Sequence, residues 1–334
     1  MDATPRELSY SQAIQEAMAI AMEADERVFV LGEDVGAAGG PFKLTEGLFE
    51  RFGPARVRDT PISEQAIVGL AIGAALQGLR PVAEIMFADF AGVTYDQLAN
   101  QLAKYRYMSG GQVSVPVTVR LMGGIGGGFG AQHSQTPENW FLSIAGLKIV
   151  TPGTPADAYG LLRAAIADED PVLVFEHKGL LNSKGELADD AGPVAIGSAD
   201  VVRPGEHVTV VANQQMRFRA LEAAEALAAE GISLEVIDPR TIVPFDFETV
   251  AASVEKTNNL LVVQEAPPGG SWGATLIARL VEERLDSFDS PPVLLGGDET
   301  PIGYAATLEG AWAPDAERIA AAVRSTLAVA TAGA

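Results

Sequence analysis

A glutamate at the start of an apolar segment is the residue of this sequence best suited to exchange a proton with a ligand. Glu64 opens the segment 64–77, and after Gln65 apolar residues occupy every side of the expected helix. We therefore expect a helix that is buried all round. In its first turn a carboxylate can simply satisfy free backbone amides. Alternatively, burial at an interface raises its pKa, so that the carboxyl group exchanges a proton with a ligand nitrogen. The residues alone leave both roles open.

One of the three histidines stands beside a loop that permits close approach to a ligand. His133 follows the glycine-rich run 123–130 and is the best acid–base candidate. His177 follows an expected strand, and His207 lies in a polar turn. For each of them the alternative is a hydrogen-bonding loop residue without a catalytic role. Because the histidines are dispersed and cysteine is absent, we expect no transition-metal site.

The glycine-rich run does not match a nucleotide-binding pattern. It fails the G-x-G-x-x-G spacing and lacks the helix and acidic residue that follow in a dinucleotide site. The sequence also has no phosphate-binding loop and no G-x-S-x-G nucleophile elbow. Its glycines instead predict close backbone packing or a mobile loop beside a ligand. Phe90 ends an expected strand, where α/β folds bind ligands, so its ring could stack on a ligand or fill the core.

Helical patterns alternate with short β-branched runs, which is typical of a mostly parallel sheet covered by helices on both faces. In the first part of the chain, helices are expected at 11–24, 43–51, 64–77, 93–107 and 155–167, and strands at 28–31, 82–87, 115–121, 147–150 and 171–175. A polar stretch with several glycines, 182–198, predicts a linker. The alternation then restarts, with strands at 208–212, 233–237, 260–264 and 293–295, and helices at 217–230, 247–256, 273–285 and 315–328. We predict two α/β domains, residues 1–190 and 191–334.

Composition excludes several classes of partner. The net charge is −21, with no local cluster of Lys and Arg, which opposes binding to nucleic acid or to an anionic membrane. The longest apolar run, 66–76, is too short to span a bilayer, and no signal peptide is visible at the start. Without cysteine there is neither a disulfide framework nor a thiol nucleophile. We expect a cytoplasmic protein.

Several ordered motifs resemble one family, the β subunits of thiamine-diphosphate-dependent 2-oxoacid dehydrogenases, which are transketolase-like. The motifs are TPISE (60–64), GLRPVAEIMFADF (78–90), AKYRYMSGG (103–111), QHSQ (132–135), GLKIVTPGTPADA (146–158) and VIDPRTIVP (236–244). The resemblance implies a pyrimidine-binding domain, a transketolase-type C-terminal domain and an α2β2 heterotetramer that holds the cofactor between α and β.

The resemblance also implies a role for individual residues. Glu64 would bond the ring nitrogen of the cofactor's aminopyrimidine and favour the imino tautomer, which removes the thiazolium proton. Phe90 would stack on the pyrimidine. His133 would face the substrate and assist reaction or acyl transfer. Three further positions match the cofactor pocket: Glu33, Ile62 and Met86.

Two metals are implied by the same resemblance. Potassium would be held by main-chain groups of Val117, Ala165, Ile166, Asp168 and Asp170. Magnesium binds the diphosphate through a Gly-Asp-Gly motif of the α subunit, and this chain has no such motif. We therefore expect the chain alone to bind thiamine diphosphate poorly.

The motifs look most like those of pyruvate and acetoin dehydrogenase β subunits. Such a protein would cleave or decarboxylate a 2-oxoacid or acetoin and pass the acyl group to lipoamide on a dihydrolipoamide acyltransferase core. A transketolase-like carboligase paired with another α chain is the alternative, and a non-catalytic scaffold or a Rossmann dehydrogenase fits less well. The loop 122–130 is richer in glycine than the family pattern, which leaves the substrate open. Two further departures, at 213–216 and at Gln264, fall in the C-terminal domain.

Overall fold

A computed structural model of the chain describes residues 5–333. It consists of two compact units. The first contains the chain up to Gly124 together with Gln132–Ile196, and the second contains Ile125–Ala131 together with the chain from Gly197 on. The predicted domains, 1–190 and 191–334, follow the same division except at 125–131 and 191–196.

The first unit is built on a parallel sheet. Its strands follow the order β6-β7-β5-β4-β2-β3, and every printed neighbour pair among them is parallel. Their bounds are Lys148–Val150 (β6), Val172–His177 (β7), Thr118–Gly123 (β5), Arg80–Ile85 (β4), Val28–Gly32 (β2) and Val57–Asp59 (β3). Because all these strands run the same way, their carboxyl ends lie along one edge of the sheet.

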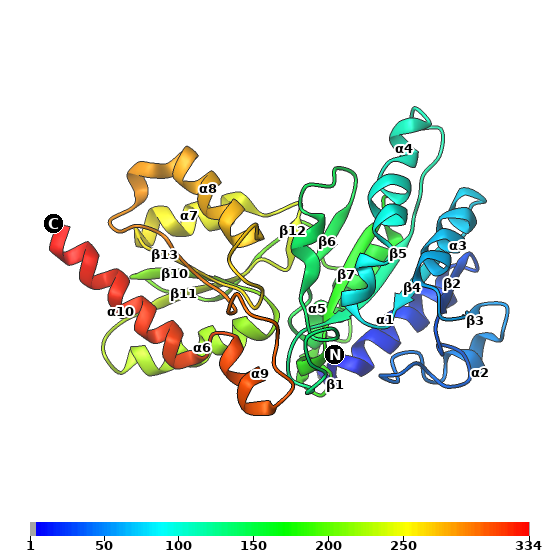
Figure 1. Cartoon of the computed structure of the whole chain (residues 1–334), viewed down its shortest axis with the longest axis horizontal. Coiled ribbons are helices and arrows are strands. Elements are labelled where there is room, and N and C mark those ends of the chain that lie inside the picture. Colours follow the sequence, from blue (N-terminus) through cyan, green and yellow to red (C-terminus); the bar gives the residue numbers. More distant parts are fainter. Residues whose placement is uncertain (1–4, 334) are drawn as a thin grey trace. The chain divides into compact units, whose positions relative to one another are not determined.

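Helices cover both faces of this sheet (Figure 1). Val28, Val30 and Val82 point into a core shared with α1 (Tyr10–Ala24) and α5 (Pro155–Ala167). Side chains alternate along a strand, so Phe29 and Leu31 point to the other face. There α3 (Glu64–Leu76) packs against β4 and β2. Both α1 and α5 begin where the sequence provides a cap, a capping box at Ser9 and a threonine cap before Pro155.

A buried ion triad crosses three neighbouring strands of this unit. Arg120 on β5 lies 2.7 Å from a carboxylate oxygen of Glu176 on β7 and 2.5 Å from one of Glu84 on β4. The side chains of Arg120 and Glu176 are each only 1% exposed. Burial raises the pKa of Glu176. It works against the charged form of Arg120 as well, but the two carboxylates outweigh it and raise the pKa of Arg120.

Several predicted elements of the first unit need correction. Gly47 has a φ of 78° and stands before the helix, so α2 spans only Leu48–Phe52 instead of 43–51. The expected helix 93–107 is interrupted, with a π-helical turn at Gln97–Leu102 followed by α4 at Tyr105–Met108. The expected linker contains β8 (Lys184–Leu187), which pairs antiparallel with β1 (Arg6–Ser9). Short 3₁₀ turns at Ala88–Gly92, Pro137–Phe141 and Lys178–Leu180 complete the unit.

The second unit has a sheet of its own, with the order β14-β13-β10-β11-β9. Its strands are Val293–Leu295 (β14), Leu260–Val263 (β13), Val208–Ala212 (β10), Leu234–Asp238 (β11) and Asp200–Arg203 (β9). Of these strands, only β9 runs antiparallel to its neighbour. It is an edge strand that we did not predict. Its helices are Gln214–Ala228 (α6), Phe247–Thr257 (α7), Trp272–Arg284 (α8), Ala306–Trp312 (α9) and Ala316–Gly333 (α10). Helix α9 was not predicted either. A 3₁₀ turn lies at Leu285–Ser287, and a short strand, β12, lies at Thr241–Val243.

The predicted fold of two mostly parallel α/β domains is confirmed. Among residues 5–333, no helix has both the length and the apolar character needed to cross a membrane.

Candidate active site

The carboxyl edge of the first sheet brings together the residues that the sequence singled out. Glu33 directly follows β2, Met86 and Phe90 follow β4, and His133 lies in the loop after β5. Glu64 is the first residue of α3, which follows β3. Since β5, β4, β2 and β3 are neighbours in the sheet, these five residues share one edge of it.

Glu64 is half-buried at the N-terminus of α3. The residue before it, Ser63, is extended and its side chain does not cap the helix. Among residues 5–333, none donates a hydrogen bond to the Glu64 carboxylate. The amide-capping role that its position allowed is therefore not realised, and the carboxylate is available to a ligand.

Glu33 is electrostatically coupled to Glu64. Burial raises the pKa of Glu33, and the negative charges of Asp34 and Glu64 raise it further. A ligand nitrogen that carries a proton or a positive charge would relieve this repulsion. The two carboxyl groups therefore favour a cation or a proton donor over an anion at this point.

Aromatic rings form the next part of the site. The His133 ring meets Phe87 and Phe90 edge-on, with centroid distances of 4.7 and 5.2 Å. Phe87 also contacts Phe90 and Phe42 edge-on, at 5.8 and 5.6 Å. An imidazole and the ring expected to stack on a ligand thus lie in one cluster, although they come from different loops.

The main chain around His133 is held by two side chains that we did not predict. Lys178, at the end of β7, donates from Nζ to the carbonyl oxygen of His133 at 2.6 Å. Asp89 accepts hydrogen bonds from the backbone amide and the side-chain amide of Gln135, at 3.2 and 2.7 Å. The amide of Gly124 donates to the carbonyl of Gln135 at 3.2 Å and closes the base of the loop. In the sequence, Asp89 is distinguished only by its position next to Phe90, and Lys178 only by its position next to His177.

The other two histidines each accept a hydrogen bond from a backbone amide. His177 is 1% exposed, and its Nδ1 accepts a hydrogen bond from the amide of Gly179. Its ring lies so close to Gly124 that a Cβ there would be 2.3 Å from Nε2. Nδ1 of His207 accepts from the amide of Ser233 at 2.9 Å. Of the three histidines, His133 is the one placed with the predicted ligand-binding residues.

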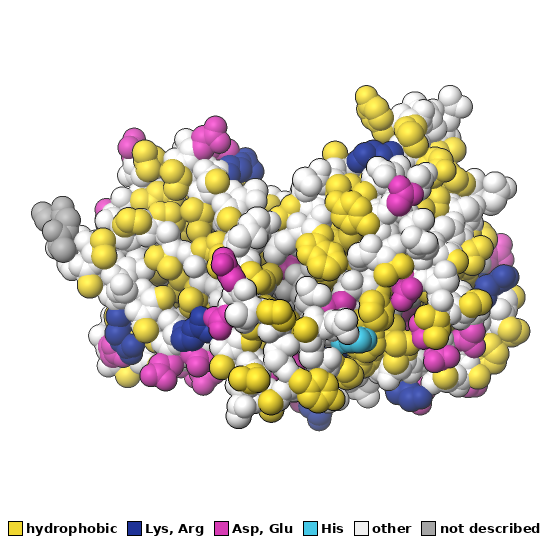
Figure 2. Space-filling model, viewed as in Figure 1, with side chains coloured by type: hydrophobic (Ala, Val, Ile, Leu, Met, Phe, Trp, Pro, Cys, Tyr) yellow, Lys and Arg dark blue, Asp and Glu magenta, His cyan; other side chains and the backbone are white. Residues whose placement is uncertain are grey.

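The prediction that α3 is buried on every side is wrong for the single chain. Ile67, Val68 and Ala71 are buried, but Leu70 is 59% exposed, and the small residues at 66, 69 and 73 face solvent with it. Ile62, just before the helix, is 76% exposed. Figure 2 shows apolar side chains on the surface over the α3 and α4 region. The single chain therefore buries one side of α3 and leaves the other side exposed.

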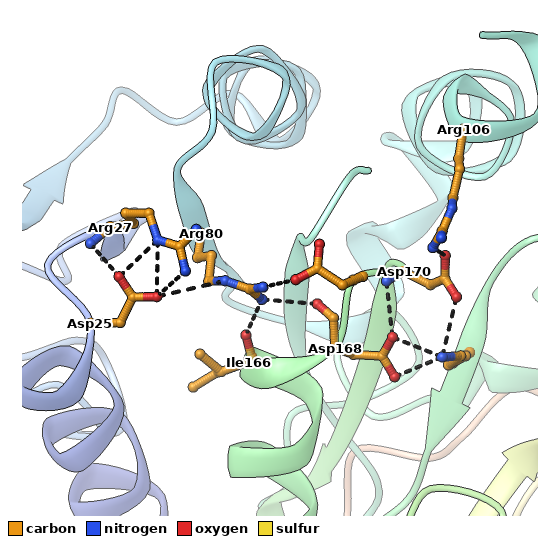
Figure 3. A network of polar contacts seen from close by, with 9 residues as sticks. Asp25, Arg27, Arg80, Arg106, Ile166, Asp168 and Asp170 are labelled. Carbon is orange, nitrogen blue, oxygen red and sulfur yellow. Dashed lines mark hydrogen bonds and ion pairs between the residues drawn. The ribbon is translucent and has the colours of Figure 1, made fainter. Parts of the chain in front are cut away.

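Two of the residues expected to hold potassium, Ile166 and Asp168, contact an arginine, Arg80 (Figure 3). Nη1 of Arg80 donates to the carbonyl oxygens of Ile166 and Asp168, both at 3.1 Å. The guanidinium also contacts the carboxylates of Glu169 and Asp25. A hydrogen bond from Arg27, followed by the charges of Arg27 and Arg80, lowers the pKa of Asp25 to about 2.

The remaining expected potassium ligands also have protein partners. The carbonyl of Val117 accepts from the amide of Val172, and the carbonyl of Ala165 accepts from the amide of Asp168. The Asp170 carboxylate pairs with Arg106 and Lys148. The carbonyls of Ile166 and Asp168 therefore already bind a cation, the Arg80 guanidinium.

Comparison with known proteins agrees with the two-unit α/β fold. A family model described as the transketolase pyrimidine binding domain matches residues 6–184, and one described as the transketolase C-terminal domain matches residues 197–319. A solved structure, "Split gene transketolase, inactive beta4 tetramer", superposes with a TM-score of 0.80 and 23% identity, covering 96% of this chain and 99% of that one. At that identity the likeness establishes the fold alone.

Curated relatives are closer in sequence. The 2-oxoisovalerate dehydrogenase subunit beta of Bacillus subtilis (strain 168) is 46% identical over 320 residues, which covers 95% of this chain and 98% of the relative. The acetoin:2,6-dichlorophenolindophenol oxidoreductase subunit beta of the same organism is 44% identical, with coverage of 94% and 95%. The chloroplastic pyruvate dehydrogenase E1 component subunit beta-3 of Oryza sativa subsp. japonica is 42% identical, with coverage of 93% and 80%. With transketolase-type domains in both halves and these relatives along nearly its whole length, the chain belongs to the family of β subunits of pyruvate, acetoin and 2-oxoisovalerate dehydrogenases.

Proposed function

We propose that this chain is the β subunit of a thiamine-diphosphate-dependent dehydrogenase that cleaves or decarboxylates a 2-oxoacid or acetoin and passes the acyl group to lipoamide. The observation that carries the proposal is the set of groups at the carboxyl edge of the first sheet. Glu33 and Glu64, whose negative charges repel each other, and the clustered rings of Phe90 and His133 all belong to this edge. An aminopyrimidine suits both kinds of group, since its ring nitrogen can share a proton with a carboxyl group and its flat aromatic face can pack against a ring.

Each residue of this set has a defined task. Thiamine diphosphate, when bound, supplies the carbon nucleophile of the reaction. Glu64 holds a proton at the pyrimidine nitrogen, and Phe90 packs against the ring. Glu33, Ile62 and Met86 line the same pocket. His133 exchanges a proton at the substrate side or assists acyl transfer.

An α subunit is the partner that fits the exposed side of this site. Ile62 and Leu70 are exposed apolar residues next to Glu64, and such a surface needs a covering protein. We propose an α2β2 heterotetramer in which the α chain supplies the magnesium ion and the diphosphate site, and which docks on a dihydrolipoamide acyltransferase core. Glu33 and Glu64 serve the pyrimidine end only, so half of the active site belongs to each chain.

Potassium is proposed at Val117, Ala165, Ile166, Asp168 and Asp170 only as an alternative to Arg80. The ion would have to displace Nη1 of Arg80 from the carbonyls of Ile166 and Asp168. A cytoplasmic location stays a prediction, since the relatives include chloroplastic plant proteins as well as bacterial ones.

Co-expression with a cognate α chain tests the proposed function. The complex should reduce an artificial electron acceptor when given a 2-oxoacid or acetoin, and calorimetry should show tight thiamine diphosphate binding by the complex but not by the β chain alone. Glu64→Gln should remove most activity while leaving assembly intact. The exposed Glu206 provides a matched control, because Glu206→Gln makes the same change of charge in the second unit. Wild-type turnover by the Glu64→Gln complex would refute the role of this carboxyl group. Carboligation without acyl transfer to lipoamide would favour the carboligase instead.

A further inference from the structure

The glycine-rich segment 124–130 has a regular alternation of backbone conformation. Gly124, Gly126, Gly128 and Gly130 have positive φ angles of 87°, 105°, 64° and 74°. Other residue types adopt such angles only with strain, so glycine is required at these four positions. Alternation of this kind turns successive backbone amides toward one side, where they form a concave anion-binding nest.

A carboxylate of the second unit fills this nest. Oε1 of Glu309 accepts from the amides of Gly126, Gly127 and Gly128 at 3.0, 3.4 and 3.3 Å. Oε2 of the same residue accepts from the Gly128 amide at 3.1 Å. Glu309 is only 5% exposed and lies on the short helix α9. Its charge is thus held by three consecutive amides, which are partners that a buried carboxylate needs.

The residue before the nest is fixed in the same unit. The amide of Ile125 donates to Glu265 at 2.8 Å, and the Ile125 side chain is buried in the core of the second unit. The carboxylates of Glu265 and Glu309, together with the buried side chain of Ile125, therefore determine the backbone path of residues 125–128. The chain leaves this unit after Ala131, and His133 follows two residues later.

We propose that Glu309 is a positioning residue for His133. By holding the amides of 126–128, its carboxylate fixes one end of the short segment that leads into the histidine, and it thereby limits the orientations that the imidazole can take. The consequence for catalysis rests on the proposed function of His133, whereas the ordering of the segment does not. This role also gives a reason for the glycine content of the loop and for the acidic residue at 265.

A cavity beside the nest makes a chemical test possible. It has a volume of about 520 Å³ and is lined by Gly126–Gly128, Gln215, Arg219, Tyr304 and Glu309, among others. If Glu309 is shortened to alanine, a small carboxylate from solution can reach the vacated amides through this space. Formate is the probe, because it has the same charged group as the missing side chain.

The experiment compares Glu309→Ala, Glu309→Gln and the exposed control Glu299→Gln in the assembled complex with its α chain. Hydrogen exchange of peptides covering 124–135 should become roughly ten- to a hundredfold faster in Glu309→Ala, because charged hydrogen bonds are lost, and less so in Glu309→Gln, which keeps an acceptor oxygen. The kcat should fall in the same order with little change in KM. Formate should slow the exchange and restore kcat in Glu309→Ala only. Glu299→Gln should match the wild type in every measurement.

Two results would overturn the proposal. Unchanged exchange at 126–128 in both Glu309 variants would show that the carboxylate does not order the segment. Faster exchange with unaltered kcat and no effect of formate would show that the ordering has no consequence for His133. A wild-type complex inactive toward 2-oxoacids and acetoin refutes the proposed function instead, and the exchange data then still decide whether Glu309 orders the segment.

Discussion

The imidazole of His133 meets the ring of Phe90 at an angle of 80°, with the two centroids 5.2 Å apart. The two residues lie in loops that follow neighbouring strands, β4 and β5. The two rings are therefore held next to each other although they come from different loops. This relationship places the expected cofactor contact and the expected acid–base group within reach of a single bound molecule.

Lys178 should matter for turnover through the backbone of His133. Lys178→Met removes the 2.6 Å hydrogen bond to the His133 carbonyl but keeps the length of the side chain. Because misplacement of a reacting group by about 1 Å can cost roughly a hundredfold in rate, we expect kcat to fall by about tenfold or more with a smaller change in KM. Steady-state kinetics of the assembled complex measure both. Lys178→Arg keeps a donor and should recover most of the loss; equal rates for wild type and Lys178→Met would rule out this support.

Glu33 should make stability depend on pH. Burial, with the charges of Asp34 and Glu64, raises its pKa above the ordinary 4.5, so ionising Glu33 costs folding free energy. Glu33→Gln should therefore stabilise the chain at neutral pH. The gain should be absent below pH 4.5 and should grow as the pH rises through the raised pKa of the folded state. Thermal midpoints from pH 4 to 8 measure it, with Glu206→Gln as the control. A variant less stable than wild type at pH 8 would contradict the expected sign.

Arg120 should be essential for the stability of the first unit. Arg120→Met would leave the carboxylates of Glu84 and Glu176 buried without their shared cation, at a cost of about 3–5 kcal/mol. Urea unfolding of the full chain gives the free energy of unfolding. Replacing all three residues by apolar ones of similar size should recover most of the loss, since no charge then remains buried. If the single variant were as stable as wild type, the triad would contribute nothing.

Thermal unfolding in different salts can distinguish whether Arg80 or a potassium ion occupies the carbonyls of Ile166 and Asp168. With Nη1 of Arg80 already bonded to the carbonyls of Ile166 and Asp168, the wild-type thermal midpoint should be equal in potassium chloride and choline chloride at the same ionic strength. Arg80→Met should lower the midpoint in choline chloride, and potassium should restore part of it. A rise of the wild-type midpoint with potassium, but not with sodium, would instead support the ion at this site.

Residue type and chain position were sufficient to predict that three candidate residues lie at one edge of the first sheet, while their roles in binding and catalysis stay predictions. Glu64, Phe90 and His133 each follow a strand or begin a helix, and the parallel order of the strands brings such positions to one edge. The hydrophobic alternation likewise predicted both sheets. These are local patterns, and they can be read without knowing what lies opposite.

The supporting residues could not be predicted in the same way. Three of them, Asp89, Lys178 and Glu309, form hydrogen bonds with backbone groups of loops that are distant in the sequence. Every residue type except proline has the same backbone amide and carbonyl, so the sequence does not show which residue is the partner. The extent of the helix at 43–51 was misjudged because a positive φ at Gly47 is a conformational property rather than a periodicity. The apolar pattern of α3 predicted burial but could not tell which molecule provides it.

The exposed apolar side of α3, formed by Leu70 and the small residues at 66, 69 and 73, makes the stability of this chain depend on the concentration of its proposed partner. In the proposed assembly, Leu70 and the small residues beside it would be covered only while an α chain is bound, and unbound copies would carry an exposed apolar surface prone to self-association. By mass action, the apparent stability of the β chain then rises with the concentration of α. A cell that synthesises the two chains unequally would lose the surplus, so the scarcer polypeptide would set the amount of enzyme.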